Sequence, residues 1–360
     1  MLEPVSDAPR IERTRTSWIR SPYVIGVDAG NSKSDAVVAT TDGRLLAWCQ
    51  GPGVVSPLGR LAVWRDRLLP LVEQALDKAG VAPASTAACA VYFLANIDLP
   101  AERRIARREL TRAAFAEVTA VENDTLAVLH AGASRPWGIG VVAGAGINAI
   151  GVHPSGRTAG YLALGDYTGD FGGGHSLGVH CLAAAIRDRD GRGPHTVLTT
   201  LVPRHFGLRT ADQVAIAVHN RTLERERLRV LAPVLFEAAA TGDPVAMGIL
   251  TAFADEVAIM ASALIRRLHL VRTDVEVILG GGMLQSKHDV LLDRVTARVL
   301  EKAPLAQIRV LDVAPVCGAV VDALRRAGAE GARRRIKGAL IAAAKHHQPV
   351  RVPGPTHSAR

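Results

Sequence analysis

An acid followed by a run of small residues marks the end of the first apolar segment of the chain. Residues 24–27 are apolar, Asp28 follows them, and Ala-Gly-Asn-Ser-Lys-Ser-Asp leads into a second apolar run at 36–39. A turn of Gly, Asn and Ser can direct backbone N–H groups toward an anion. A lone carboxylate such as Asp28 suits Mg²⁺, which takes one or two carboxylates together with phosphate oxygens. The stretch fits either a nucleotide-phosphate site or an ordinary hairpin with a glycine turn.

The same pattern occurs a second time. An apolar run at 137–143 meets the small turn 144–148, and a further apolar run follows at 149–152. Two such loops facing each other across a cleft would hold a polyphosphate from both sides, so the repetition favours the phosphate interpretation. Residues 144–149 also match a loose dinucleotide fingerprint, but that site needs a helix directly after the glycines, and here a strand is predicted. A third glycine cluster, 280–282, ends the apolar run 275–279.

Asp124 is the candidate for proton transfer. It follows a short predicted strand at 118–121, and a carboxylate at a strand end can take the proton from a hydroxyl during phosphoryl transfer. Asp is also a favoured first residue of a helix, and a helix is predicted from Thr125. The residues alone leave the two roles, general base and helix cap, equally open.

The ordered set of motifs resembles the BadF/BadG/BcrA/BcrD-type ATPase family, which contains N-acetylglucosamine kinases and belongs to the sugar kinase, actin and heat-shock-chaperone superfamily. The resemblance extends from about residue 23 to about residue 328. The motifs that carry it are 28–34, 122–124, 144–146, 169–174, 190–194, 279–282 and 315–319.

This resemblance implies an α/β fold with two ribonuclease-H-like (actin-like ATPase) domains and a cleft between them. The expected N-terminal domain spans 22–135, and the C-terminal domain, with a helical insertion, spans 136–330. Residues 1–21 are expected to be a disordered leader and 331–360 a basic tail, in which 333–344 could form a short amphipathic helix.

The resemblance also implies ATP- and Mg²⁺-dependent phosphorylation of an amino sugar, in the first place N-acetylglucosamine at its 6-hydroxyl. Asp124 would be the general base and Asp28 would orient the metal. The residues implied for nucleotide binding are Gly30, Asn31, Ser32, Lys33, Gly144, Ala145, Gly146, Gly280, Gly281 and Gly282. Those implied for the sugar are Asn96, Asp98, Asn123, Asp124 and Asp170.

Three positions depart from the family pattern or leave a choice. The family usually has Thr where Ala145 stands, so backbone donors must suffice there, and it usually has Gly near Asn96, which puts the details of the sugar pocket in doubt. Asp166 is an alternative to Asp170, because both follow a glycine in the same loop. Asp170 is preferred because the glycines downstream of it then align with the family motif.

Two other functions remain as alternatives. Some relatives in this family are ATPases that activate iron–sulfur dehydratases or reductases, which need cysteine ligands for the cluster. The loop 169–174 contains no cysteine, and Cys181 and Cys317 lack the required spacing. The second alternative is a non-catalytic nucleotide-binding protein of the same fold.

Charge and cysteine content limit the partners and the compartment. The formal charge of +9 arises at the two ends, with a net +8 in 325–360 and +1 in 1–20, so the body between them is neutral and no specific nucleic-acid partner is expected. The four cysteines are far apart, which is typical of a reducing compartment. The first residues are charged rather than apolar, so we expect a cytoplasmic protein without a membrane partner. The oligomeric state stays open, with a homodimer as the candidate.

Overall fold

The computed structural model describes residues 22–54, 62–82, 85–286 and 288–344. The predicted leader, residues 1–21, and the last part of the predicted tail, residues 345–360, lie outside the described residues.

The first half of the chain forms a five-stranded mixed sheet. Its order is β3-β2-β1-β4-β5, with β4 parallel to both β1 and β5 and β2 antiparallel to both β1 and β3. Residues in β1 and β4 are nearly all buried, as expected for central strands covered on both faces. The strands are β1 (Tyr23–Ala29), β2 (Lys33–Thr40), β3 (Leu45–Pro52), β4 (Ala87–Leu94) and β5 (Ala116–Asn123).

The second half builds a sheet of the same design. Its order is β10-β9-β6-β7-β8, so β6 takes the place of β1, and the strands pair in the same parallel and antiparallel senses as in the first sheet. The two copies of strand, glycine turn and strand predicted from the sequence are therefore present. The strands are β6 (Gly138–Ala143), β7 (Ile147–Val152), β8 (Thr158–Gly160), β9 (Glu276–Gly280) and β10 (Gln307–Val310).

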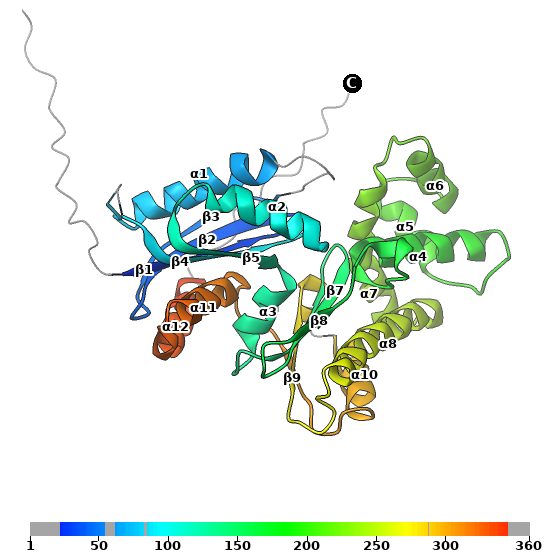
Figure 1. Cartoon of the computed structure of the whole chain (residues 1–360). Coiled ribbons are helices and arrows are strands. Elements are labelled where there is room, and N and C mark those ends of the chain that lie inside the picture. The colour runs from blue at the N-terminus through cyan, green and yellow to red at the C-terminus, as the bar shows by residue number, and fades with distance from the viewer. Residues whose placement is uncertain (1–21, 55–61, 83–84, 287, 345–360) are drawn as a thin grey trace, which may run out of the picture.

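Helices cover both faces of the first sheet. Helices α1 (Ala62–Lys78) and α2 (Pro100–Thr111) lie on one face, while α11 (Val316–Arg326) and α12 (Arg333–Ala344) lie on the other (Figure 1). Helix α3 (Thr125–Gly132) packs between the two sheets, against both α11 and β6. The layers approach closely, because a β-carbon on Gly26 of β1 would lie 2.6 Å from the backbone nitrogen of Val320.

The helical insertion of the second half shares one core with the second sheet. Helix α8 begins at the cap Asp243, whose side chain accepts a hydrogen bond from the Ala246 amide. Within the described residues, α8 alone is long and apolar enough to cross a membrane, and half of that stretch is buried inside the fold. The elements are η1 (Gly165–Tyr167), α4 (Gly173–Arg189), α5 (Leu198–His205), α6 (Ala211–His219), η2 (Arg225–Leu231), α7 (Ala232–Ala240), α8 (Pro244–Arg267), α9 (Gly282–Gln285) and α10 (Asp289–Leu300).

The C-terminal region differs from the expectation that residues 331–360 form a tail outside the two domains. After the short η3 (Glu330–Ala332), helix α12 buries Ile336 and Leu340 in the core that surrounds α11. The Arg333 guanidinium also donates hydrogen bonds to the carbonyl oxygens of Ala133 and Ser134, just before the second sheet begins. The basic charge of 333–337 thus lies on a packed helix, because Ile336 and Leu340, four residues apart, place one face of the helix against the core.

Candidate active site

A cleft of about 300 Å³ lies between the two halves of the molecule. Strands β1, β4 and β5 are parallel and end at the same edge of their sheet, so the residues that follow them meet there. The turn between β6 and β7 lines the cleft as well. The predicted site residues that line it are Asp28, Gly30, Asn31, Ser32, Lys33, Asn96, Asp98, Asp124, Gly144, Ala145 and Gly146.

The first glycine loop is held by its own backbone and by its neighbours. The Gly30 amide donates to the Lys33 carbonyl oxygen at 2.9 Å, which closes the turn between β1 and β2. The Gly30 carbonyl accepts from the Val54 amide at 2.9 Å, and the Asn96 side-chain amide donates to Asn31 Oδ1 at 2.5 Å. Asn96, a predicted sugar-binding residue, thus also holds the first glycine loop in place through this hydrogen bond.

Lys33 has a partner that the sequence did not reveal. Its Nζ lies 3.0 Å from Asp35 Oδ2, and Asp35 is almost fully buried. The other oxygen of Asp35 accepts hydrogen bonds from Trp48 and Gln50 on β3. The lysine charge is therefore fixed at the edge of the cleft by a buried acid.

Asp28 is surrounded by negative charge. It is half-buried at the end of β1, and Asp35 lies directly opposite it on β2. Burial raises its pKa well above the ordinary value, Asp124 and Asp35 raise it further, and only Lys33 opposes them. No described residue donates a hydrogen bond to its carboxylate, which leaves the oxygens available to a ligand.

Asp124 stands at the first turn of α3 but does not cap it. Its side chain accepts no capping hydrogen bond, whereas the Thr125 amide donates to Asn123 Oδ1 at 3.0 Å. Burial raises the pKa of Asp124 to about 7, the charge of Asp98 adds to this, and nearby backbone amides offset part of it. A carboxyl group with such a pKa is poised to exchange a proton near neutral pH.

Asp98 links the two halves across the cleft. Its Oδ1 accepts hydrogen bonds from Asn123 of the first half at 2.9 Å and from Asn148 of the second half at 3.1 Å. Burial raises its pKa to about 6, and the charges of Glu102 and Asp170 raise it while the two amides lower it. The predicted sugar residues Asp98 and Asn123 are thus in direct contact.

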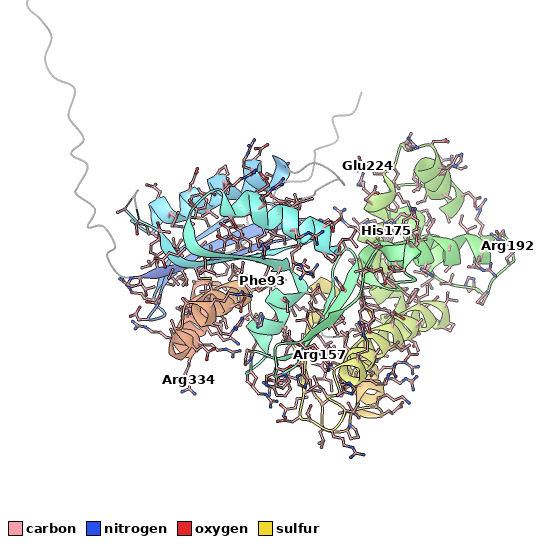
Figure 2. All side chains as sticks on the ribbon, viewed as in Figure 1. Phe93, Arg157, His175, Arg192, Glu224 and Arg334 are labelled. Carbon is pink, nitrogen blue, oxygen red and sulfur yellow. The ribbon has the colours of Figure 1, made fainter. Side chains whose placement is uncertain are left out.

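The second glycine loop rests on the start of α4. The amides of Gly174 and His175 donate to the carbonyl oxygens of Gly144 and Ala145 at 2.8 and 3.0 Å; Figure 2 shows His175 at this end of α4. Gly173 has a φ of +74°, and a β-carbon on it would lie 2.4 Å from the Gly146 backbone. The triple glycine in this loop therefore has a structural purpose, which is to let α4 approach the turn.

The structure separates the two acids of the loop 165–170. Asp166 is exposed and forms an ion pair with Arg225 at 3.3 Å. Asp170 accepts hydrogen bonds from the Gly165 amide and the Thr168 hydroxyl, as a turn residue would, yet its charge also acts on Asp98 and on Glu256 of α8. Neither acid lines the cleft itself, and both line the pocket beside it, so the choice of Asp170 stays a prediction.

The third glycine cluster lies beside the second. Gly281 has a φ of +86°, and its β-carbon would meet the Ala143 carbonyl oxygen at 2.3 Å. Gly280, Gly281 and Gly282 do not line the cleft described above. Their predicted contact with the nucleotide therefore stays a prediction, and Gly281 has a packing reason of its own.

Comparison with known proteins agrees with this geometry. The family model of the BadF/BadG/BcrA/BcrD ATPases matches residues 25–323. The chain belongs to the BadF/BadG/BcrA/BcrD ATPase family. The predicted family and fold class are thereby confirmed.

Several proteins that are similar to this chain are named as sugar kinases. An N-acetylmuramic acid/N-acetylglucosamine kinase of Clostridium acetobutylicum is 26% identical over 265 residues, which cover 73% of this chain and 86% of that protein. An N-acetyl-D-glucosamine kinase of Dictyostelium discoideum is 24% identical, with 83% and 97% covered. The crystal structure of a proposed N-acetylglucosamine kinase from Chromobacterium violaceum shares the fold, with a TM-score of 0.65, 24% identity and coverage of 84% and 98%.

The donor set of the cleft fits a magnesium ion bound together with a nucleotide. Asp28 offers an unbonded carboxylate among like charges, and a divalent cation would relieve that repulsion. Within the described residues there is no group of three or more His, Cys, Asp or Glu that could hold a metal by itself. Magnesium takes one or two carboxylates together with phosphate oxygens, a donor set to which Asp28 would contribute.

Three residues of the site were missed by the sequence prediction. Asn148 lines the cleft and reaches Asp98, but a lone Asn at the end of the small turn 144–148 has no distinctive pattern. Thr125 also lines the cleft, with a buried hydroxyl that has no hydrogen-bond partner. The β1–β2 register could have revealed the third, Asp35, because it places Asp35 opposite Asp28.

Proposed function

We propose that this protein is an ATP-dependent sugar kinase that phosphorylates the 6-hydroxyl of an amino sugar, with N-acetylglucosamine as the first candidate. The observation that carries the proposal is Asp124: a carboxyl group with a pKa raised to about 7, whose side chain makes no capping hydrogen bond, in a cleft between two glycine loops. Family membership supports ATP as the donor. The names of the two curated relatives support the amino sugar.

In this proposal the first half supplies the base and the metal ligand. Ionised Asp124 accepts the proton of the sugar hydroxyl as that oxygen attacks the terminal phosphorus. Asp28 would hold Mg²⁺, which neutralises charge on the phosphate oxygens when it is bound. Residues 30–33 and 144–146 would hold the phosphates from the two sides of the cleft.

The sugar is expected to lie beside the Asp98 bridge. Asp98, Asn123 and Asn148 are already hydrogen-bonded to one another, so their orientation is set before a ligand arrives. Asp170 would contact a sugar hydroxyl from the second half, and Asn96 would brace the opposite wall. The reacting hydroxyl would then lie near Asp124.

No structural observation favours the iron–sulfur alternative. The four cysteines are buried, and burial raises the thiol pKa of Cys89 and Cys317 to about 11 and that of Cys181 to about 12. Cluster ligands must be thiolates at a surface shared between subunits. These positions offer neither, so the proposal rests on the kinase.

The test is a panel of sugars with ATP and Mg²⁺. We expect ADP release with N-acetylglucosamine, and a phosphorus NMR signal coupled to the C6 protons of the product. Glucosamine, N-acetylmannosamine, glucose and, because of the Clostridium relative's name, N-acetylmuramic acid complete the panel. ATP binding without turnover of any sugar would instead favour a non-catalytic nucleotide-binding protein.

A further inference from the structure

A second cavity lies next to the catalytic cleft and is about twice as large. Its volume is about 640 Å³, within the range of roughly 300–1,000 Å³ that is typical of small-molecule sites. The bridge residues Asp98, Asn123 and Asn148 all line this cavity, and Asp98 and Asn148 line the catalytic cleft as well, so the bridge between the halves separates the two spaces. No residue of the phosphate loops and neither Asp28 nor Asp124 lines the second cavity.

The walls of this cavity come from both halves of the molecule. Helices α2, α3 and α11 and strand β5 line it on the side of the first sheet. Strands β7 and β8 and the C-terminal end of α8 line it on the side of the second. The segment that joins the halves contributes Pro136 and Trp137. A ligand here would touch both halves and the connection between them.

Arginine dominates the charged groups of the lining. Four arginines face the cavity, against the acids Asp98 and Glu122. Each arginine uses only part of its hydrogen-bonding capacity, since a guanidinium carries five N–H donors. The arginines are Arg103 on α2, Arg267 on α8, and Arg325 and Arg326 on α11.

The contacts of these arginines leave some guanidinium N–H donors available to a ligand. Arg103 forms an ion pair with Glu122 at 3.1 Å, but its Nε is buried without a partner. Arg325 and Arg326 share one buried acid, Asp322. Counting Asp322 with the two lining acids, four positive charges face three negative ones, so the cavity favours an anion.

His130 adds a neutral polar group to the same cavity. It lies on α3, its relative exposure is 7%, and it has no hydrogen-bond partner among the described residues. Its ring stacks on Phe93 with centroids 6.0 Å apart. Burial lowers the pKa of His130 to about 4, so the imidazole is uncharged at neutral pH and offers one donor and one acceptor. That pair of functions matches a hydroxyl group.

We propose that this cavity, lined by Arg103, Arg267, Arg325, Arg326 and His130, is a second binding site for a hydroxylated anion of the sugar-phosphate class, distinct from the catalytic cleft. The arginines would bind the phosphate, with bidentate pairing as the strongest arrangement. His130 would bind a ring hydroxyl. Because the site spans both halves, its occupant would change how readily they close on the acceptor sugar. Binding itself does not depend on the proposed kinase activity.

The direct test is calorimetric titration of the full chain without ATP. The probes are N-acetylglucosamine 6-phosphate and glucose 6-phosphate, with inorganic phosphate as the plain anion, each in the presence and absence of saturating N-acetylglucosamine. We expect the sugar phosphates to bind whether or not the neutral sugar is present, and at least tenfold more tightly than inorganic phosphate. Sugar-phosphate binding abolished by the neutral sugar would place the ligand in the catalytic cleft and overturn the proposal.

Matched variants localise the binding. Arg103→Gln on α2 and Arg267→Gln on α8 remove one cavity arginine from each half, while Arg104→Gln and Arg266→Gln remove their sequence neighbours, which do not line the cavity. Each cavity variant should weaken sugar-phosphate binding about tenfold or more, and each neighbour should leave it unchanged. Equal effects of both members of a pair would overturn the proposal, because only general charge would then matter.

His130→Phe tests the hydroxyl contact. The ring can still stack on Phe93, so folding is conserved, as a melting curve would verify. We expect weaker binding of the sugar phosphates with unchanged binding of inorganic phosphate. Identical affinity of the variant and the parent chain for the sugar phosphates would refute the role of His130, and equal affinity of the parent for inorganic phosphate would refute the sugar part.

Discussion

The buried acids of the cleft make opposite demands on folding and on catalysis. A carboxyl group with a folded-state pKa of about 7, far above its ordinary value of 3.8, binds its proton more tightly in the folded protein. Its contribution to stability is therefore present at low pH and is lost as the pH rises from about 4 through about 7. The same ionisation produces the base that the proposed reaction needs.

Asp124→Asn separates these two effects. Asn keeps the shape but cannot take up a proton, so turnover should fall by at least about a hundredfold. The melting temperature at pH 8 should equal or exceed that of the parent chain, because a buried charge is gone, and the two should converge at pH 5. Steady-state kinetics and calorimetric melting at both pH values check this. Near-normal turnover would remove Asp124 from the role of base and make Asp170 the next candidate.

The pH profile of the parent enzyme provides a second test of Asp124. With a base of pKa about 7, kcat/KM for the sugar should rise about tenfold per pH unit below neutrality and level off above it. The profile should be measured from pH 5.5 to 8.5 at saturating ATP and Mg²⁺. A flat profile down to pH 5.5 would contradict an ionisation of this kind in the rate-determining step.

Gly146→Val tests the phosphate loop without disturbing the fold. A β-carbon at Gly146 meets no protein atom within 4 Å, and its φ is not in the left-handed region. A larger side chain there should clash only with a ligand, so the Michaelis constant for ATP should rise strongly while the melting temperature stays within about a degree. If the sugar constant alone changed, the loop would belong to the acceptor rather than to ATP.

At the scale of elements, the repeated hairpins could be predicted because their glycine turns and apolar runs are local in sequence. The full order of strands was not predicted, because β4 and β9 pair with β1 and β6 across long connections. By contrast, Asp98, Asn123 and Asn148 meet only because β4 and β5 end close to where β7 begins, and nothing local marks that meeting. The packing of α12 was missed for a related reason. It packs beside α11 and against the linker at 133–134, and that linker lies far from α12 in the sequence.

The crossing of α3 and α11 gives an element-scale prediction. A β-carbon on Gly318 of α11 would lie 2.0 Å from the Ala127 carbonyl oxygen of α3. Gly318→Ala should therefore force the helices apart and lower the melting temperature by several degrees. Gly338→Ala in α12 is the control, since nothing lies within 4 Å there and alanine is favoured in a helix by about 0.5–1 kcal/mol. Equal melting temperatures for the two variants would show that the layers are not in close contact.

At the scale of the whole molecule, the residue at which the basic segment begins is not the residue at which the packed body ends. The sequence analysis placed 331–360 in a basic tail outside the two domains, because the surplus charge lies there. The structure places 333–344 in a helix that buries Ile336 and Leu340 and binds the linker between the halves through Arg333. Charge was thus a poor guide to the boundary of the folded body.

Two truncations test where the folded body ends. A chain ending at Ala344 should keep its melting temperature and turnover, and should lose part of any salt-sensitive, nonspecific binding to nucleic acid, because it lacks three basic residues. A chain ending at Ala332 should melt several degrees lower, since each large side chain withdrawn from the core removes about 1.5–3 kcal/mol and exposes apolar surface of α11. Its kcat should fall as well, because the linker between the halves loses the Arg333 contacts. Melting curves and kinetics of both chains at one salt concentration decide the matter. If the shorter chain melted and turned over like the longer one, α12 would be an appendage and the original boundary would stand.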